Sequence, residues 1–154
     1  MSYQDEAPFN WVLWLLWIFT TTLGWLIGST FLPPAYGVGV TIGFAQWLVL
    51  RPLFPKTGWW ILATAAGWTL GWGVIFITTP PQIETIIGAV LGAITGFAQW
   101  FILKNWVPKA GWWVIVSSLG WAIGLSGFVD FPYVGVLVGV ITGIGIELMI
   151  RYSK

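Results

Sequence analysis

A five-residue block, Gly43-Phe-Ala-Gln-Trp47, recurs unchanged as Gly96-Phe-Ala-Gln-Trp100. After each block come a basic residue, a Pro-Lys pair and a Gly-Trp-Trp triplet, at Arg51, Pro55 and Gly58 and again at Lys104, Pro108 and Gly111. A third, more divergent copy is recognisable near the end of the chain, where Gly139-Val-Ile-Thr-Gly143 matches Gly92-Ala-Ile-Thr-Gly96 and Arg151 takes the basic position. Self-similarity at a fixed offset indicates one structural unit used several times. The sequence therefore predicts a fold made of three copies of one unit.

Each copy of the unit is a pair of apolar segments. In the whole chain 58% of residues are hydrophobic and 7% are charged, whereas about 25% of a typical soluble domain is charged. Six segments approach the roughly 20 apolar residues that cross a bilayer: Asn10–Phe31, Pro33–Leu50, Gly58–Thr78, Ile83–Leu103, Gly111–Phe128 and Tyr133–Ile150. Long apolar runs without alternation are typical of helices and not of barrel strands. We expect an all-α membrane protein with six transmembrane helices.

The repeat divides these helices into three consecutive helical hairpins. Their approximate bounds are 10–54, 58–104 and 111–151, within a single transmembrane domain that covers 1–154. Because the three hairpins are similar in sequence, we expect them to pack with approximate pseudo-three-fold symmetry.

All the basic residues follow the even-numbered segments: Arg51, Lys56, Lys104, Lys109, Arg151 and Lys154. The connections on the opposite side hold no Lys or Arg. Short loops rich in Lys and Arg stay in the cytoplasm, so both termini are expected there. The first residues hold Asp5 and Glu6 where a signal peptide would be basic, so we expect the first helix to be retained as an anchor.

The chain has no Cys and no His. That inventory excludes thiol and histidine nucleophile–base pairs, the usual zinc sites and haem ligation by His or Cys, and we expect no catalytic or metal-binding residues. A net charge of +1 provides no basic surface for nucleic acid. We therefore expect a non-enzymatic protein whose partners include membrane lipids. No cofactor can be assigned; a pigment, a quinone or a lipid remains open.

Glycines at four-residue spacing mark one face of each even-numbered helix. Small residues let helices approach closely in a bilayer, where hiding apolar side chains from lipid contributes little. The expected packing glycines are Gly39, Gly43, Gly88, Gly92, Gly96, Gly135, Gly139 and Gly143. The alternative is that some of these faces line a ligand cavity or a pore.

Three strongly polar side chains lie inside the expected helices: Gln46, Gln99 and Glu147. Each is on the glycine face of its helix and about 6–8 Å from the basic residue that ends the helix, at 1.5 Å per residue. They form a candidate polar cluster at the cytoplasmic mouth. An ionisable residue inside a span is a functional candidate by default, but Glu147 can also be an interfacial ion pair with Arg151, four residues later.

Hydroxyl and indole side chains also recur. Thr21, Thr64 and Ser117 hold equivalent positions, where each hydroxyl either bonds a carbonyl one turn back or lines a polar axis. Five tryptophans adjoin the basic loops and are expected at headgroup level: Trp59, Trp60, Trp106, Trp112 and Trp113. Trp25, Trp68 and Trp121 lie deeper. They are either bulk at helix contacts or a stacking wall for a flat cofactor.

The repeated Gly-Phe-Ala-Gln-Trp block, the Gly-Trp-Trp turn and the Gly-Trp-x-x-Gly helix resemble a group of small, polytopic, mostly uncharacterised membrane proteins of cyanobacteria and similar bacteria. The resemblance covers about Trp11 to Arg151. It implies a bacterial inner or thylakoid-type membrane and carries no functional residues over. The third copy departs from the pattern, because Ile146 and Glu147 replace Gln and Trp.

The leading hypothesis is an accessory or scaffold component that packs against a larger membrane complex, its lipids or pigments. The alternative is a small transporter or channel with Gln46, Gln99 and Glu147 at its cytoplasmic mouth. A vitamin-binding membrane subunit fits the number of helices but not the triplication.

Overall fold

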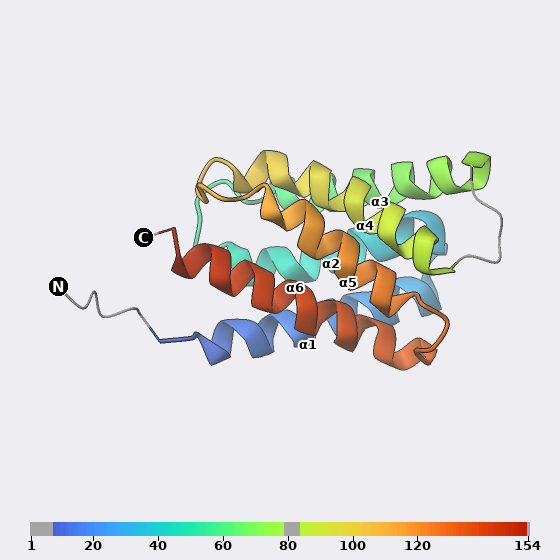
Figure 1. Ribbon diagram of the computed structural model, residues 1–154, viewed down its shortest axis with the longest axis horizontal. Helices are drawn as coiled ribbons and strands as arrows, with labels where there is room; N and C mark the ends of the chain where they lie inside the picture. The colour runs from blue at the N-terminus through green and yellow to red at the C-terminus, as the bar shows by residue number, and fades with distance from the viewer. Residues whose placement is uncertain (1–7, 79–83, 154) are drawn as a thin grey trace, which may run out of the picture.

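The computed structural model describes residues 8–78 and 84–153, and over these residues the chain is helical, with no β-strand. Figure 1 shows a bundle of antiparallel helices. The helices are α1 (Trp11–Phe31), α2 (Pro34–Leu50), α3 (Trp59–Thr78), α4 (Glu84–Leu103), α5 (Trp112–Gly124) and α6 (Val134–Arg151), with a 3-10 turn, η1 (Phe131–Tyr133), before α6. The all-α prediction is confirmed.

The helix ends follow from local chemistry. The side chain of Asn10 caps α1 by accepting a hydrogen bond from the Leu13 amide at 3.0 Å, which satisfies one of the unpaired donors of the first turn. Pro34 begins α2, where a missing N–H costs nothing. The expected segment Gly111–Phe128 is too long: α5 ends at Gly124, and Gly127 then adopts a φ of 75°. That left-handed conformation belongs to a turn and is readily adopted only by glycine.

Four helical stretches are long and apolar enough to cross a membrane: Trp11–Phe31, Trp59–Ile77, Glu84–Leu103 and Phe131–Arg151. The apolar helices α2 and α5 are shorter, with 17 and 13 residues. At 1.5 Å per residue α5 is about 20 Å long, less than the hydrocarbon thickness of about 30 Å. Length and composition thus support four of the six expected crossings directly.

Each helix packs mainly against its two neighbours in the chain, and α6 returns to contact α1, so the six helices form a closed ring. Glycine lies at every one of these contacts. A Cβ added to Gly24 of α1 would lie 2.6 Å from the Ile42 Cα of α2, and one added to Gly39 of α2 would lie 2.6 Å from the Trp68 Cβ of α3. The same pattern joins α3 to α4 through Gly67, α4 to α5 through Gly92, α5 to α6 through Gly124, and α6 to α1 through Gly139.

The expected packing glycines of the even-numbered helices all face the next helix of the ring. Gly39 and Gly43 lie against α3, Gly88, Gly92 and Gly96 against α5, and Gly135, Gly139 and Gly143 against α1. No one of these eight positions has room for a side chain, since the nearest atom to an added Cβ is always within 3.0 Å. Close packing at small residues is how apolar helices associate in lipid.

Charge is divided between the two ends of the bundle. The α2–α3 and α4–α5 loops and the end of α6 lie together at one end in Figure 1, and they carry Arg51, Lys56, Lys104, Lys109 and Arg151. Lys154 lies outside the described residues. At this end the tryptophan of each five-residue block contacts a basic residue. The Arg51 guanidinium is 5.5 Å from the Trp47 ring centroid, and the Lys104 ammonium is 4.9 Å from that of Trp100. Glu84 and Asp130 belong to the opposite end.

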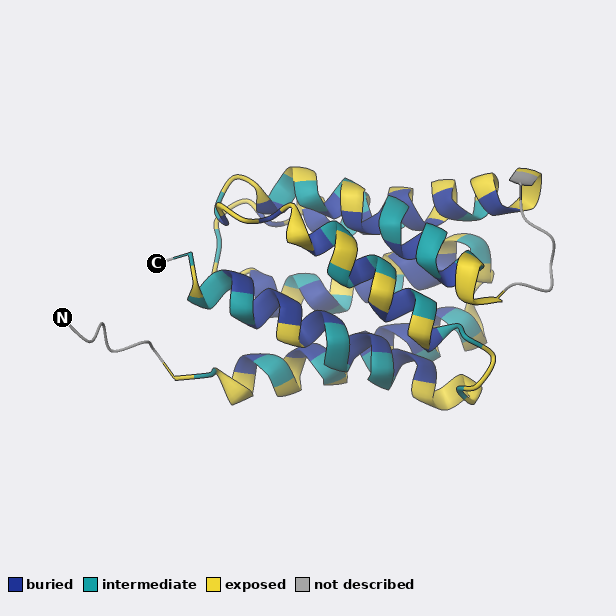
Figure 2. Ribbon diagram, in the orientation of Figure 1, coloured by how far each residue is buried: buried dark blue, intermediate teal, exposed yellow. Residues whose placement is uncertain are grey.

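The outer surface of the bundle is apolar. Figure 2 shows buried residues along the inward side of the helices and exposed residues outside, and the exposed ones include large hydrophobic side chains such as Val12, Phe19, Leu62, Phe97 and Leu119. A soluble protein rarely exposes apolar area on this scale. The surface is compatible with a protein that lies in a membrane.

Candidate functional site

Three equivalent tryptophans from the odd-numbered helices fill the interior near the basic end. Trp17, Trp60 and Trp113 are 0–1% exposed. The Trp17 ring centroid is 6.2 Å from that of Trp60 and 5.8 Å from that of Trp113, and the last two are 5.8 Å apart. The Trp17–Trp60 and Trp17–Trp113 pairs are edge-to-face, an arrangement that indole rings favour. We call these residues the basic-end tryptophan layer.

A second layer closes the interior toward the other end. Trp25, Trp68 and Trp121 have ring centroids 4.6–6.5 Å apart. The Trp25 indole donates to the Phe131 carbonyl at 2.9 Å, and that of Trp68 donates to the Pro34 carbonyl at 2.8 Å. These are the three tryptophans expected to lie deeper, and their rings pack against one another inside the bundle. We call them the acidic-end tryptophan layer.

Gln46 and Gln99 connect neighbouring helices through equivalent hydrogen bonds. The Gln46 amide donates to the Thr21 hydroxyl at 3.1 Å, and its carbonyl accepts from the Trp60 indole at 3.1 Å. The Gln99 amide donates to the Thr64 hydroxyl at 2.8 Å, and its carbonyl accepts from the Trp113 indole at 2.7 Å. Both side chains are at most 4% exposed. Each glutamine therefore ties an even-numbered helix to the odd-numbered helices on both sides.

Between α6 and α1 the buried indole has a different acceptor. Ile146 stands where a glutamine would be and is fully buried. The Trp17 indole donates instead to the Thr142 hydroxyl of α6 at 3.0 Å, and this hydroxyl donates to the Val138 carbonyl. The Trp17 indole of the first hairpin thus finds its acceptor on α6 of the third hairpin, although no glutamine stands at position 146. A buried donor left without one would cost about 1–3 kcal/mol.

A small void lies between the two tryptophan layers. It measures about 10 Å³ and is lined by polar side chains that include Gln46, Thr64, Thr95, Gln99 and Thr142. That volume is close to the minimum for a single water. The Thr95 hydroxyl is buried there without a hydrogen-bond partner. This void is large enough for about one water and too small for a larger solute.

The three recurring hydroxyl residues are all buried beside this interior. Thr64 combines the two roles expected for such a hydroxyl, since it donates to the Trp60 carbonyl at 2.7 Å and accepts from Gln99. Thr21 accepts from Gln46, and Ser117 lines the void. The Thr21 and Thr64 hydroxyls therefore join neighbouring helices.

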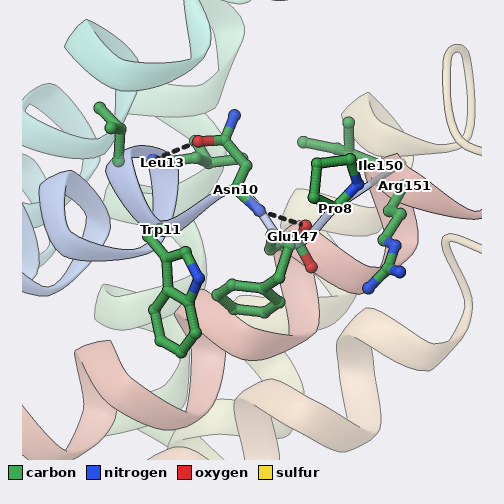
Figure 3. Close-up of a pocket in the computed structure, with 9 residues that line it drawn as sticks. Pro8, Asn10, Trp11, Leu13, Glu147, Ile150 and Arg151 are labelled. Carbon is green, nitrogen blue, oxygen red and sulfur yellow. Dashed lines mark hydrogen bonds between the residues drawn. The ribbon is translucent and has the colours of Figure 1, made fainter. Parts of the chain in front are cut away.

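The structure brings Gln46 and Gln99 together around the void and places Glu147 elsewhere. Glu147 lines a separate pocket between the start of α1 and the end of α6. Its Oε1 accepts a hydrogen bond from the backbone N–H of Asn10 at 2.9 Å. The sequence spacing predicted only Arg151 as a partner of Glu147, so this contact was not expected. Figure 3 shows this bond, with Arg151 on the same side of the pocket.

Sequence reasoning misplaced two tryptophans and passed over a third. Trp60 and Trp113, expected at headgroup level, are buried in the basic-end layer, whereas their neighbours Trp59 and Trp112 are 65% and 60% exposed. The third is Trp17, which precedes Thr21 by the same four residues that separate Trp60 from Thr64. That shared spacing is the signal that would have identified it.

The fold and interior define a class: an all-helical bundle with a lipid-compatible surface, four helices able to cross a membrane and a tryptophan-filled interior. Comparison of the chain with protein-family models, with curated proteins and with solved structures found no match.

Proposed function

We propose that this chain is a non-enzymatic integral membrane protein that acts through its outer surface. Its role is that of an accessory or scaffold component that packs against a larger membrane complex, its lipids or pigments. The observation that carries this proposal is the closed interior, in which two layers of three tryptophans leave only about 10 Å³ between them. Because so little space remains between the layers, we expect partners to bind the outer helix faces and not this part of the interior.

The alternative, a small transporter or channel, has less support. A conducting path needs polar groups that can exchange partners with a solute, whereas Gln46 and Gln99 are each bonded to a threonine and a tryptophan. The third member of the expected mouth, Glu147, lines a different pocket.

We further propose that all six helices cross the membrane as three pseudosymmetric hairpins. Supporting this arrangement are the antiparallel closed ring and the meeting of equivalent tryptophans in each layer. The short α5 would be completed by the turn that follows it. The resemblance of the repeats to cyanobacterial membrane proteins favours a bacterial inner or thylakoid-type membrane, with the basic end and both termini in the cytoplasm.

The topology predicts the behaviour of reporter fusions. A reporter that works only in the cytoplasm should be active when fused after Lys154 and inactive when inserted at Gln82, between α3 and α4. Both positions lie outside the described residues. Activity at Gln82 and none after Lys154 would reverse the orientation, and activity at both would exclude an odd number of crossings between them.

Purification and reconstitution test the role. After extraction in mild detergent, the protein should retain a partner complex, lipid or pigment on its surface. In sealed vesicles it should show no proton or cation flux above that of empty vesicles, because the interior is closed. Glu147→Gln, which removes the buried carboxylate, should leave this baseline unchanged. A flux that wild-type protein supports and Glu147→Gln abolishes would establish the transporter alternative.

A further inference from the structure

A pocket of about 500 Å³ lies at the basic end of the bundle, where α1 begins and α6 ends. Two charged residues of α6, Glu147 and Arg151, line it together with apolar residues that include Trp11, Val12 and Ile150. Figure 3 shows the two charged side chains on one side of the pocket and the start of α1 on the other. The pocket is separate from the void between the tryptophan layers.

One carboxylate oxygen of Glu147, a residue that lines this pocket, accepts no hydrogen bond. The residue is 2% exposed, and its Oε1 accepts from the Asn10 amide. Its Oε2 is buried and has no hydrogen-bond partner. Burial of a carboxylate oxygen without a donor is costly, more so than for a neutral group. A ligand that brought an N–H donor to Oε2 would relieve that cost, so this atom indicates a donor-bearing, positively charged group.

The second charge restricts the ligand further. Arg151 follows Glu147 by four residues on α6, a spacing that puts the two Cβ atoms about 5–6 Å apart on one helix face. A carboxylate and a guanidinium that line one pocket from the same helix face carry charges opposite to those of a small zwitterion. An ammonium group and a phosphate joined by two carbons form such a zwitterion, and guanidinium groups bind phosphate well.

We propose that the pocket binds the headgroup of an aminophospholipid, with its primary ammonium group donating to Glu147 Oε2 and its phosphate beside Arg151. This proposal rests on the membrane location proposed above. The bordering α1 residues Trp11 and Val12 are 62% and 67% exposed, and Leu15, Leu16 and Phe19 continue the exposed apolar surface. The acyl chains would lie along this face of α1, while the headgroup occupies the pocket at the level of the basic loops.

Entry to Oε2 requires a small movement, because the atom is itself covered. Pro8 and Phe9 line the pocket and precede α1 without belonging to a helix. Their displacement would leave the hydrogen bonds between residues four apart in α1 intact, at the cost of the 3.1 Å bond from the Trp11 N–H to the Phe9 carbonyl. The Asn10 amide can remain on Oε1 while the ligand reaches Oε2.

The chemistry of Oε2 distinguishes ethanolamine from choline lipids. A primary ammonium has N–H donors, whereas the quaternary ammonium of choline has none. In detergent, added phosphatidylethanolamine should raise the melting temperature of the wild-type protein, with the rise growing as the logarithm of lipid concentration. Phosphatidylcholine with the same acyl chains should give no comparable rise. Glu147→Gln should abolish the response to phosphatidylethanolamine, and the matched control Glu84→Gln, at the opposite end, should retain it.

Each contrary result identifies what is wrong. If both lipids raised the melting temperature of the wild type equally, the effect would be general solvation by lipid, and the proposed headgroup site would be wrong. This outcome does not depend on whether Glu147→Gln folds. An equal rise with soluble phosphoethanolamine would show that the ligand is a free zwitterion and not a lipid. Protein extracted from membranes that shows no ethanolamine preference overturns the pocket alone. A chain recovered in the soluble fraction overturns the membrane location as well.

Discussion

Replacing Trp60 by alanine should cause a large loss of stability. The Trp60 ring is fully buried, contacts Trp17 and Trp113, and donates to the Gln46 carbonyl. Truncation removes these contacts, opens a cavity in the basic-end tryptophan layer and leaves Gln46 without its donor. Large-to-alanine changes of buried aromatic residues cost about 3–5 kcal/mol. A marked fall in melting temperature in detergent is the expected result.

The adjacent residue provides the control. Trp59 has the same side chain in the same turn of α3 but is 65% exposed, so Trp59→Ala should change the melting temperature little. Trp112→Ala and Trp113→Ala repeat the comparison on α5, where the exposed fractions are 60% and 1%. If both members of a pair had equal effects, the inward layer would not be the source of stability.

Adding a single methyl group at Gly92 should force α4 and α5 apart. An alanine Cβ there would overlap the Ser117 carbonyl oxygen and lie 2.8 Å from the Ser118 Cα. Both atoms are backbone, so no rotation of a side chain can relieve the clash. Overpacking typically costs about 1–3 kcal/mol, and a rigid backbone contact favours the upper part of that range. Gly92→Ala should therefore lower the melting temperature clearly, and Gly92→Leu should lower it further.

Gly73 of α3 is the matched control, because nothing lies within 4 Å of a Cβ built there. Alanine is a better helix former than glycine by about 0.5–1 kcal/mol, so Gly73→Ala should leave stability unchanged or raise it. The two substitutions are chemically identical and differ only in what the added methyl group meets. A similar fall for both would attribute the effect to glycine as such and not to the helix contact.

The contacts between helices in the closed ring explain the residues of the repeated five-residue block. Gly43 and Gly96 lie against the next helix, where an added Cβ would be 2.9 Å from the Thr64 Cβ and 2.8 Å from the Ser117 Cβ. The glutamine three residues later reaches the interior, and the tryptophan after it lies beneath a basic residue. One turn of helix thus carries a helix contact, a core hydrogen bond and an anchor at the basic end.

Several features of the fold could be predicted from the sequence because they depend on local chemistry. Helical hydrogen bonds join residues four apart, so long apolar runs punctuated by glycine, proline and charge predicted the helices to within a few residues. The main error, at the end of α5, came from treating Leu125–Phe128 as apolar helix when Gly127 turns the chain. The sequence also predicted that the basic residues lie at one end of the bundle, because this depends only on which loops hold them.

Orientation within the bundle required the tertiary structure. These helices are apolar on all sides, so hydropathy does not indicate which face points inward, and the two tryptophans of each Trp-Trp pair are equivalent by composition. Packing separates them: only the second ring meets its counterparts from the other odd-numbered helices. The contact of Glu147 with Asn10 likewise spans 137 residues, because it exists only once α6 closes the ring on α1. The sequence alone determined that there are helices and where their charged ends lie; shape complementarity between them decided which side chains became the interior.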